Sequence, residues 1–225
     1  MSILAHRFGQ AVSWSFLRAF SALHVSGAQR LPRGGPLLLL ANHISHYDPP
    51  ALSASSRLVI NYMTDRAMLE VPYFGRVLRG LETFPVDRDQ VDRAAVKTAL
   101  TRLKAGRVVG VFPEGGIRDG AQSVLGGAAM PPGGPALWAM ARCPAVVACI
   151  IGTDQLYVGR NFRRRPRIFV RYGEVLPPPE RGADRAELGV RLAAELRTLY
   201  REIDERYQLT EDERPASAQA RWASA

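Results

Sequence analysis

A histidine and an aspartate that could act together in catalysis follow a run of four leucines. The stretch LLLLANHISHYDPPAL, residues 37–52, places His43 five positions before Asp48. A carboxylate bonded to one ring nitrogen of a histidine leaves the other nitrogen able to take a proton near neutral pH. The pair is therefore a candidate general base for a substrate hydroxyl. Because Pro49 and Pro50 follow it, Asp48 could instead be only the N-cap of a helix.

Two other chemistries use the same residue types. His43, His46 and Asp48 could ligate a metal ion, but the only other histidines are His6 and His24. No second cluster of histidine or cysteine completes such a site, so we expect no metal. No serine or cysteine lies in a G-x-S-x-G nucleophile motif, so a covalent intermediate is not indicated. The base would therefore activate a hydroxyl of the substrate itself.

Arginines and glycines that could hold a phosphate come later in the chain. Arg88 lies in the segment VDRD, and Arg118 follows Gly115 and Gly116 closely. A guanidinium fork matches phosphate oxygens, and glycine lets backbone N–H groups approach a ligand. Glu114 could bond an acceptor hydroxyl or orient an arginine. Each of these residues could also be part of a surface ion pair or an ordinary turn.

The composition is that of one globular domain. The 225 residues are 47% hydrophobic, which is enough to bury a substantial core. Cys143 and Cys149 lack metal-site spacing and lie in or beside an apolar run, so we expect buried free thiols of a cytosolic protein.

The net charge of +9 indicates an anionic partner, which could be a nucleic acid, a membrane surface or a phosphorylated substrate. The densest basic cluster is RNFRRRPR, residues 160–167. It could be a solvated loop, or it could contact lipid phosphates or an acidic carrier protein. A nucleic-acid-binding protein is an alternative that rests on charge alone. We recognise no such module and expect no nucleic-acid partner.

The N-terminal segment, residues 1–30, has the pattern of an amphipathic helix. Its apolar residues are Trp14, Phe16, Leu17, Phe20 and Leu23, with Arg18 among them. A bilayer span needs about 20 apolar residues, which this segment lacks. We therefore expect it to pack on the domain, to lie in the interfacial layer of a membrane, or both, in a cytoplasmic protein that is peripheral at the cytoplasmic face.

Short apolar runs alternate with helical patterns along residues 31–209, which predicts a single α/β domain with a mostly parallel or mixed central sheet covered by helices. The tail, residues 210–225, is polar and rich in alanine and serine, so we expect it to be disordered. The predicted strands are Pro36–Ala41, Arg57–Met63, Glu82–Val86, Arg107–Phe112, Ala145–Ile151 and Arg167–Tyr172. The predicted helices are Asp65–Leu78, Asp89–Leu103, Pro135–Ala141 and Ala183–Gln208.

The polar segments NHISHYD, VDRD and PEGGIRDG each follow a predicted strand. In sheets of this kind, ligands bind beyond the carboxyl ends of the strands, where loops meet helix N-termini. We therefore expect the three segments to share one edge of the sheet.

Four blocks of the sequence resemble the motif blocks of glycerolipid acyltransferases, the lysophosphatidate acyltransferase-like superfamily, in order and rough spacing. They are NHISHYD (42–48), GLETFPVDR (80–88), FPEGG (112–116) and CPAVVACIIG (143–152). The resemblance covers roughly residues 37–175. The His-x4-Asp block and the Phe-Pro-Glu-Gly block are specific in combination, although either alone would be weak.

The resemblance implies that His43 is the general base, that Asp48 orients it, and that the activated hydroxyl attacks an acyl thioester directly. It also implies that Arg88, Glu114 and Gly115 belong to the acceptor site for a glycerol-phosphate head group. The donor would be acyl-CoA or an acyl-carrier protein, and the acceptor would be a lysophospholipid such as 1-acylglycerol-3-phosphate. No cofactor is implied. The domain at 31–209 would then be an acyltransferase domain that works on an anionic membrane surface.

The sequence departs from the family pattern at two places, of which the first concerns the acceptor and the second mostly the shape of the backbone. The family's third block usually continues Phe-Pro-Glu-Gly-Thr-Arg, whereas here Gly116 and Ile117 follow and Arg118 comes one position late. Val147 stands where the fourth block commonly has a second proline. A different lysolipid or an amino-lipid acceptor therefore stays open. A catalytically silent lipid-binding relative is a further alternative, against which the presence of both His43 and Asp48 argues.

Overall fold

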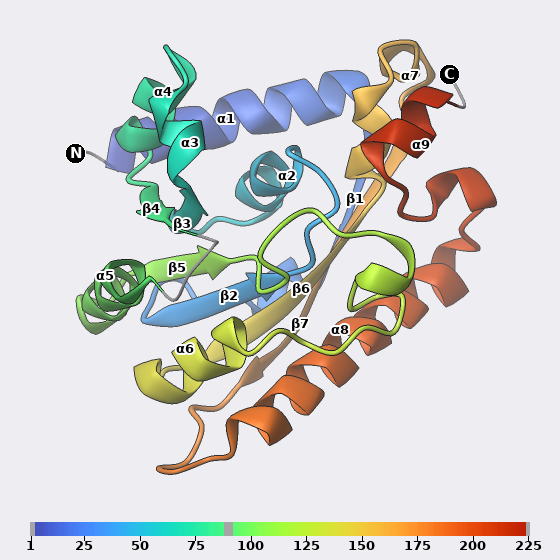
Figure 1. Ribbon diagram of the computed structural model, residues 1–225. Helices are drawn as coiled ribbons and strands as arrows, with labels where there is room; N and C mark the ends of the chain where they lie inside the picture. The colour runs from blue at the N-terminus through green and yellow to red at the C-terminus, as the bar shows by residue number, and fades with distance from the viewer. Residues whose placement is uncertain (1–2, 88–91, 224–225) are drawn as a thin grey trace.

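A seven-stranded sheet lies at the centre of the computed structural model, which describes residues 3–87 and 92–223 (Figure 1). The strand order is β1-β7-β6-β2-β5-β3-β4. The five strands from β2 to β6 in chain order are parallel, β7 is antiparallel to β6, and β1 is parallel to β7. The predicted α/β fold with a mostly parallel or mixed sheet is confirmed. The strands are β1 (Ala22–Ser26), β2 (Leu37–Ala41), β3 (Ile60–Asp65), β4 (Phe84–Val86), β5 (Val108–Val111), β6 (Ala145–Ile151) and β7 (Arg167–Leu176).

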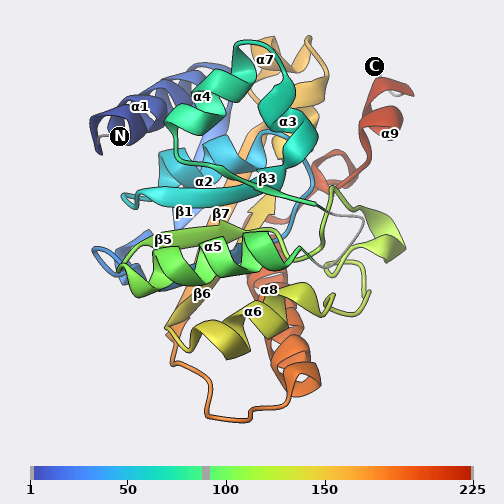
Figure 2. The ribbon, with the colours of Figure 1, turned by 60° about the vertical axis from the view of Figure 1, so that its left-hand side comes forward.

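Helices cover both faces of this sheet, which explains the uninterrupted run of leucines. Leu38 and Leu40 of β2 pack in one core cluster with α5 (Arg93–Lys104), α6 (Gly133–Ala141) and α8 (Arg185–Tyr207). Leu37 and Leu39 point to the opposite face and pack in a second cluster with α1 (Ile3–Phe20) and α2 (Asp48–Ser55). Figure 2 shows the two helical layers on either side of the sheet. A parallel strand buried on both faces has no polar alternation.

One predicted helix is two helices in the structure. The range Asp65–Leu78 contains α3 (Arg66–Glu70) and α4 (Phe74–Gly80), with Pro72 between them. Proline disfavours helical backbone in the residue before it, and Tyr73 adopts a positive φ of 62°. The remaining short elements are η1 (Ala28–Arg30), η2 (Gly120–Gln122), η3 (Thr153–Tyr157), α7 (Asn161–Arg164), η4 (Glu211–Glu213) and α9 (Ala218–Ala223).

The predicted N-terminal helix is present as α1, which crosses the molecule above α2 (Figure 1). Its inward side buries His6 and Leu17. The helix ends at Phe20, and Leu23, which we expected to continue it, lies in β1 instead. β1 pairs with β7 at the edge of the sheet, so the second part of the 1–30 segment belongs to the central sheet. Within the described residues, no helix is both long and apolar enough to cross a membrane.

The C-terminal tail does not have the disorder that we expected for residues 210–225. Residues 210–223 form η4, which has a capping box between Thr210 and Glu213, and then α9. The physical reason is an ion pair that the composition of the tail does not reveal. Arg221 is buried against Asp154, which lies in η3, three residues after the end of β6. Residues 224–225 lie outside the described residues.

Candidate active site

Asn42 fixes the point at which the chain leaves β2. Its side-chain amide donates to the carbonyl oxygen of Ile150 and accepts from the N–H of the same residue, both at 2.8 Å. These two bonds continue the pairing of β2 with β6 by one position after its last backbone partner, Ala41. Buried polar groups at a strand end need such partners. The loop that begins at His43 therefore starts from a fixed position at the carboxyl edge of the sheet.

The predicted contact between His43 and Asp48 is present. His43 Nδ1 lies 2.8 Å from Asp48 Oδ2, and the Asp48 side chain is fully buried. The same carboxylate oxygen accepts the backbone N–H groups of Ile44 at 2.7 Å and Ser45 at 2.8 Å. The other oxygen, Oδ1, accepts the hydroxyl of Thr153. Four donors thus hold one carboxylate in a single orientation, with one of them on the imidazole.

Asp48 does not have the ordinary N-cap role that its prolines suggested. Tyr47 is the N-cap of α2, and Asp48 is the first helical residue. The carboxylate turns back to the loop before the helix, where it bonds the N–H groups of residues 44 and 45. An acceptor at this place carries out two tasks, because it closes the turn and holds the histidine ring.

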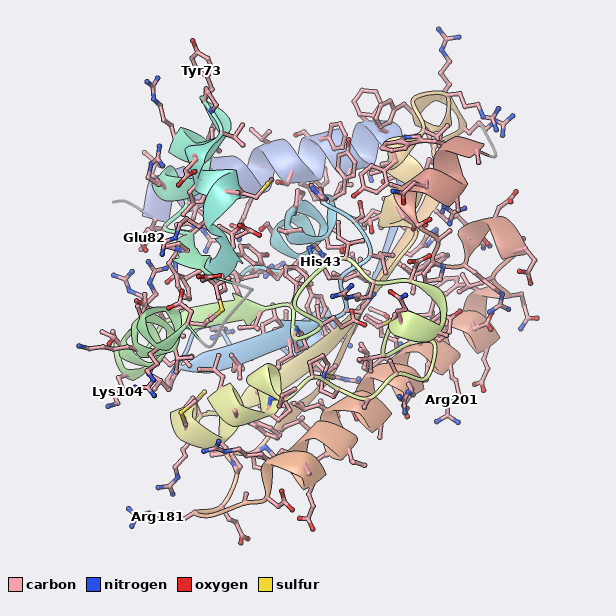
Figure 3. All side chains as sticks on the ribbon, in the orientation of Figure 1. His43, Tyr73, Glu82, Lys104, Arg181 and Arg201 are labelled. Atoms are coloured by element: carbon pink, nitrogen blue, oxygen red, sulfur yellow. The ribbon has the colours of Figure 1, made fainter. Side chains whose placement is uncertain are left out.

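Phe112 sets the plane of the His43 ring. The two rings stack with centroids 4.2 Å apart and an interplanar angle of 22°. His43 is 8% exposed and lies between α2 and the loop that follows β5 (Figure 3). Because Asp48 bonds Nδ1, a proton on Nδ1 leaves Nε2 with its lone pair. Among the described residues, none forms a hydrogen bond with Nε2. The arrangement can take a proton from a hydroxyl that reaches this nitrogen.

Glu114 joins the His43 loop to the loop after β5. Its Oε2 accepts the backbone N–H of His43 at 2.9 Å, and its Oε1 accepts the backbone N–H of Val124 at 2.7 Å. The residue is 5% exposed. Burial raises the pKa of Glu114, and the two N–H bonds offset part of that rise. We expected this carboxylate to bond an acceptor hydroxyl or an arginine, and its observed partners are the backbone N–H groups of His43 and Val124.

The glycines and arginine of the predicted phosphate site lie beside this carboxylate. Gly115 is exposed with a φ of 72°, and a Cβ placed on it would meet no atom within 4 Å. The backbone N–H of Arg118 donates to the carbonyl oxygen of His43 at 2.9 Å, and the Arg118 side chain is exposed. Gly116 lies between these positions and is half-buried. Arg88 lies outside the described residues.

The three polar segments follow strands that run in the same direction. β2, β5 and β4 are parallel members of one sheet, so their carboxyl ends lie at one edge, with β3 between β5 and β4. The structure brings the first segment and the third into direct contact through Glu114 and Arg118. The segment VDRD is described only at Val86 and Asp87.

His46 is not grouped with His43 and Asp48 as a metal site would require. Its Nδ1 and its backbone N–H both bond the hydroxyl of Tyr157, each at 3.0 Å. In the part of the chain that the structure describes, no three His, Cys, Asp or Glu side chains are grouped so as to hold a metal ion. Cys143 and Cys149 are buried free thiols.

Sequence reasoning did not identify Thr153 as part of the site. Thr153 follows β6 at the same edge of the sheet, after Gly152, which has a φ of 88°. A Cβ on Gly152 would lie 2.4 Å from the carbonyl oxygen of Arg167, so this turn requires glycine. The available signal is a polar residue after a parallel strand and a glycine, and Thr153 directly follows the block CPAVVACIIG.

Comparison with known proteins gives a consistent family. The family model described as Acyltransferase matches residues 22–151. The 1-acyl-sn-glycerol-3-phosphate acyltransferase of Bacillus subtilis (strain 168) is 28% identical over 92 residues, which are 40% of this chain and 46% of that protein. The protein of the same name from Borreliella burgdorferi is 26% identical over 93 residues, which are 40% of this chain and 37% of that protein. The match therefore spans less than half the length of either relative.

A solved structure has the same fold. The crystal structure of the 1-acyl-sn-glycerophosphate (LPA) acyltransferase, PlsC, from Thermotoga maritima superposes with a TM-score of 0.71. The superposition covers 92% of this chain and 80% of that one, at 20% identity. At this identity the likeness establishes the architecture that holds the site.

Proposed function

The chain belongs to the acyltransferase family, and on that premise we propose that it moves a fatty acyl group from an acyl thioester to the hydroxyl of a lysophospholipid. The preferred acceptor is 1-acylglycerol-3-phosphate, in phospholipid biosynthesis. The observation that carries this proposal is the His43–Asp48 pair, which lies inside the matched range and leaves His43 Nε2 for the acceptor hydroxyl. The names of both curated relatives support the choice of acceptor.

The proposed reaction is a direct displacement at the thioester carbonyl. His43 Nε2 takes the proton of the acceptor hydroxyl as its oxygen bonds to the carbonyl carbon, and Asp48 stabilises the imidazolium that results. The tetrahedral intermediate then expels the thiolate, which receives the proton from His43 Nε2. The products are the ester and a free thiol. Acyl-CoA or acyl-carrier protein is the donor, and the reaction needs no cofactor.

Arg118, Gly115 and Gly116 form the proposed site for the acceptor phosphate, together with Arg88. Support for Arg118 comes from the hydrogen bond that its backbone N–H donates to the carbonyl oxygen of His43. This bond holds the backbone of Arg118 beside residues 43–48, which we call the catalytic loop. A guanidinium and exposed glycine backbone suit a phosphate. Glu114 contributes by fixing both loops rather than by touching the acceptor.

We further propose that the enzyme is peripheral at the cytoplasmic face of a membrane and that α1 contacts the lipid. Leu4, Phe8 and Val12 recur every four residues along α1, and they are 75%, 72% and 52% exposed. Residues at this spacing share one face of a helix. That face is opposite the buried His6 and Leu17. An apolar stripe on an otherwise packed surface helix suits the interfacial layer of a bilayer.

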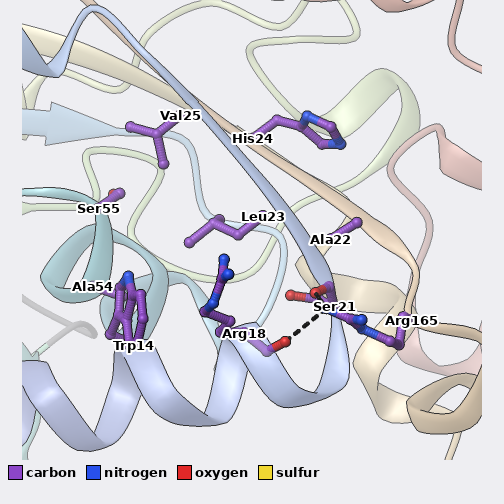
Figure 4. Close-up of a pocket in the computed structure, with 10 residues that line it drawn as sticks. All are labelled: Trp14, Arg18, Ser21, Ala22, Leu23, His24, Val25, Ala54, Ser55 and Arg165. Carbon is purple, nitrogen blue, oxygen red and sulfur yellow. Dashed lines mark hydrogen bonds between the residues drawn. The ribbon is translucent and has the colours of Figure 1, made fainter.

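A groove beside α1 supports the same orientation. It has a volume of about 350 Å³ and lies between the C-terminal half of α1 and the edge strand β1 (Figure 4). Arg18 lies over the Trp14 ring at 5.4 Å, and Arg165 donates to the carbonyl oxygens of Arg18 and Ser21. Two guanidinium groups at an amphipathic groove suit the phosphate of an anionic lipid. Neither His43 nor Asp48 lines the groove, so it is not the proposed acyl-transfer site.

Vesicle sedimentation tests the membrane contact. Replacing Leu4, Phe8 and Val12 together by glutamate should abolish binding to vesicles that contain phosphatidylglycerol. The reason is that three apolar contacts with lipid are lost and negative charge is added. Val190→Glu is the matched control, since Val190 is 71% exposed on α8. Equal binding of the triple variant and the wild type would refute a role for α1 in the contact.

A substrate panel tests the proposed reaction. Acyl-CoA and acyl-carrier-protein donors are each combined with lysophosphatidate, with other lysolipids and with an amino-lipid acceptor. The proposal expects phosphatidate from lysophosphatidate with at least one donor. Transfer to another acceptor only would change the substrate, which the unusual Gly116–Arg118 spacing makes the first alternative. No transfer with any combination would overturn the proposal.

A further inference from the structure

The catalytic loop and the C-terminal segment both bond to one short helix, η3. On the loop side, hydroxyl groups make the contacts, and the bond between His46 Nδ1 and Tyr157 adds to those that follow. The Thr153 hydroxyl donates to Asp48 Oδ1, the Ser45 hydroxyl donates to the Thr153 carbonyl oxygen at 3.2 Å, and the Tyr157 hydroxyl accepts the N–H of His46 at 3.0 Å. These contacts lie at both ends of η3. Any shift of η3 therefore changes the support of the His43–Asp48 pair.

The C-terminal segment, residues 214–223, bonds to the same two ends of η3. Asp154 is the residue next to Thr153. Arg221 donates to its Oδ2 from Nε at 2.7 Å and from Nη2 at 2.6 Å. The N–H of Ala216 donates to the same oxygen at 3.0 Å. At the other end, Trp222 Nε1 donates to the Tyr157 carbonyl oxygen at 3.2 Å. α9 lies beside this part of the chain in both ribbon views (Figures 1 and 2).

Arg221 also closes the segment on itself. Its Nη1 donates to the Asp212 carbonyl oxygen at 2.7 Å, and its Nη2 donates to the Arg214 carbonyl oxygen at 2.6 Å. The residue is 8% exposed. A buried arginine with this many bonds is costly to place unless its partners are fixed. One side chain thus fastens the turn at 212–214, α9 and η3 together.

We propose that the C-terminal segment clamps η3 and that Arg221 is a positioning residue for the catalytic His43–Asp48 pair. The path runs from Arg221 to Asp154, through the adjacent Thr153, and on to Asp48. Arg221 does not touch His43, so its effect on catalysis is exerted through the Thr153 hydroxyl. The role in catalysis rests on the proposed function, whereas the mechanical part of the proposal does not.

Hydrogen exchange tests the mechanical part without an activity assay. The amides of Ile44 and Ser45 report the Asp48 contacts directly. Arg221→Met should speed exchange of this loop by about tenfold, the equivalent of one lost hydrogen bond, while exchange of β6 stays unchanged. Arg181→Met, an exposed arginine in the loop before α8, is the matched control and should change neither. Unchanged exchange of the loop in Arg221→Met would overturn the clamp.

Kinetics test the catalytic part. Arg221→Met should lower kcat per folded molecule by about tenfold and leave both KM values within about twofold. In combination with Thr153→Val it should cause little further loss, because both changes act through one contact. Additive losses would show that Arg221 does not act through Thr153, and a lower folded fraction with unchanged kcat would assign Arg221 to stability alone; either result would overturn the positioning role. If wild type transfers no acyl group, the proposed function fails while the exchange result still decides the clamp.

A milder variant covers the outcome in which Arg221→Met does not fold. Trp222 is 59% exposed, so Trp222→Phe is a mild change. It keeps an aromatic ring at this position and removes the N–H that bonds Tyr157. Exchange of the 43–48 loop should rise by about threefold, as expected for an exposed hydrogen bond. An unchanged rate in this variant, with Arg221→Met unfolded, would also count against the clamp.

Discussion

Asp48 and Asp154 are two buried aspartates linked through Thr153, which bonds the first and adjoins the second, and they are held in opposite ways. Asp48 receives three of its four donors from residues 43 to 45, immediately before it in the chain. Among the described residues, the Asp154 side chain accepts hydrogen bonds from Ala216 and Arg221, more than 60 positions later in the chain. Asp48 has partners on both oxygens, whereas Asp154 Oδ1 is buried without a hydrogen bond from the described residues.

This difference shows which parts of a site a sequence can reveal. A carboxylate whose partners are local leaves a fixed spacing in the chain, and His-x4-Asp is such a spacing. A carboxylate whose partners are remote leaves no pattern, because an aspartate after a strand and an arginine near a terminus are common. Burial raises the pKa of Asp154 to about 6 even though Arg221 bonds it, which indicates that desolvation outweighs the pairing.

Asp48→Asn should give the largest effect on the local side of this comparison. Asp48 Oδ2 accepts from His43 Nδ1 and from two backbone N–H groups, so an asparagine keeps its amide oxygen there and turns its NH2 to the Thr153 hydroxyl, which can accept. The imidazolium that forms when His43 takes a proton then lacks a negatively charged partner. We expect kcat to fall by about 10³-fold. The measurement is kcat per folded molecule, with folding checked by circular dichroism. A fall below about tenfold would show that Asp48 mainly closes the turn.

The pH dependence of the unfolding free energy should reveal the contribution of Asp154, the aspartate whose partners are remote in the chain. A carboxyl whose folded-state pKa is raised contributes stability below its unfolded pKa and loses that contribution as pH rises through the folded value. Relative to an Asp154→Asn/Arg221→Met double variant, wild type should therefore lose about 2 kcal/mol of unfolding free energy between pH 4.5 and 7. Urea unfolding at a series of pH values measures this difference.

The opposite slope would contradict the interpretation of Asp154. If the stability of wild type relative to the double variant rises with pH, the folded-state pKa lies below the unfolded one and the ion pair with Arg221 dominates.

Glu114→Gln should give a smaller loss that is mainly one of stability. Both carboxylate oxygens accept backbone N–H groups, and a glutamine amide can accept only one of them. The other N–H is left facing a donor, at a cost of about 1–3 kcal/mol. Thermal unfolding measures it. Glu187→Gln, on the surface at the start of α8, is the control and should leave stability unchanged. Equal stability of Glu114→Gln and wild type would contradict the claim that Glu114 stabilises the fold by joining the two loops.

Much of the fold could be predicted because both faces of the sheet are covered. Six strands appear as apolar runs, and β6 has the predicted bounds, Ala145–Ile151. β1 was missed because Leu23 and Val25 continue the apolar spacing of the preceding helix, and its strand form depends on pairing with β7. The order of the tail was missed because it depends on the remote ion pair of Arg221.

The candidate site was predictable to the same degree. His43 and Asp48 were found by their spacing, and their contact is observed. The partners of Glu114 and the part played by Thr153 required the structure, since they join loops from three different strands. The assignment of Arg88 to the acceptor stays a prediction.

The central claim is that His43 Nε2 removes the proton of the acceptor hydroxyl. The most direct measurement is acyl transfer to lysophosphatidate by folded His43→Ala, with His46→Ala as the matched control in the same loop. The account predicts that His43→Ala lowers kcat by about 10³-fold or more while His46→Ala stays within about tenfold of wild type. Undiminished transfer by His43→Ala would contradict it.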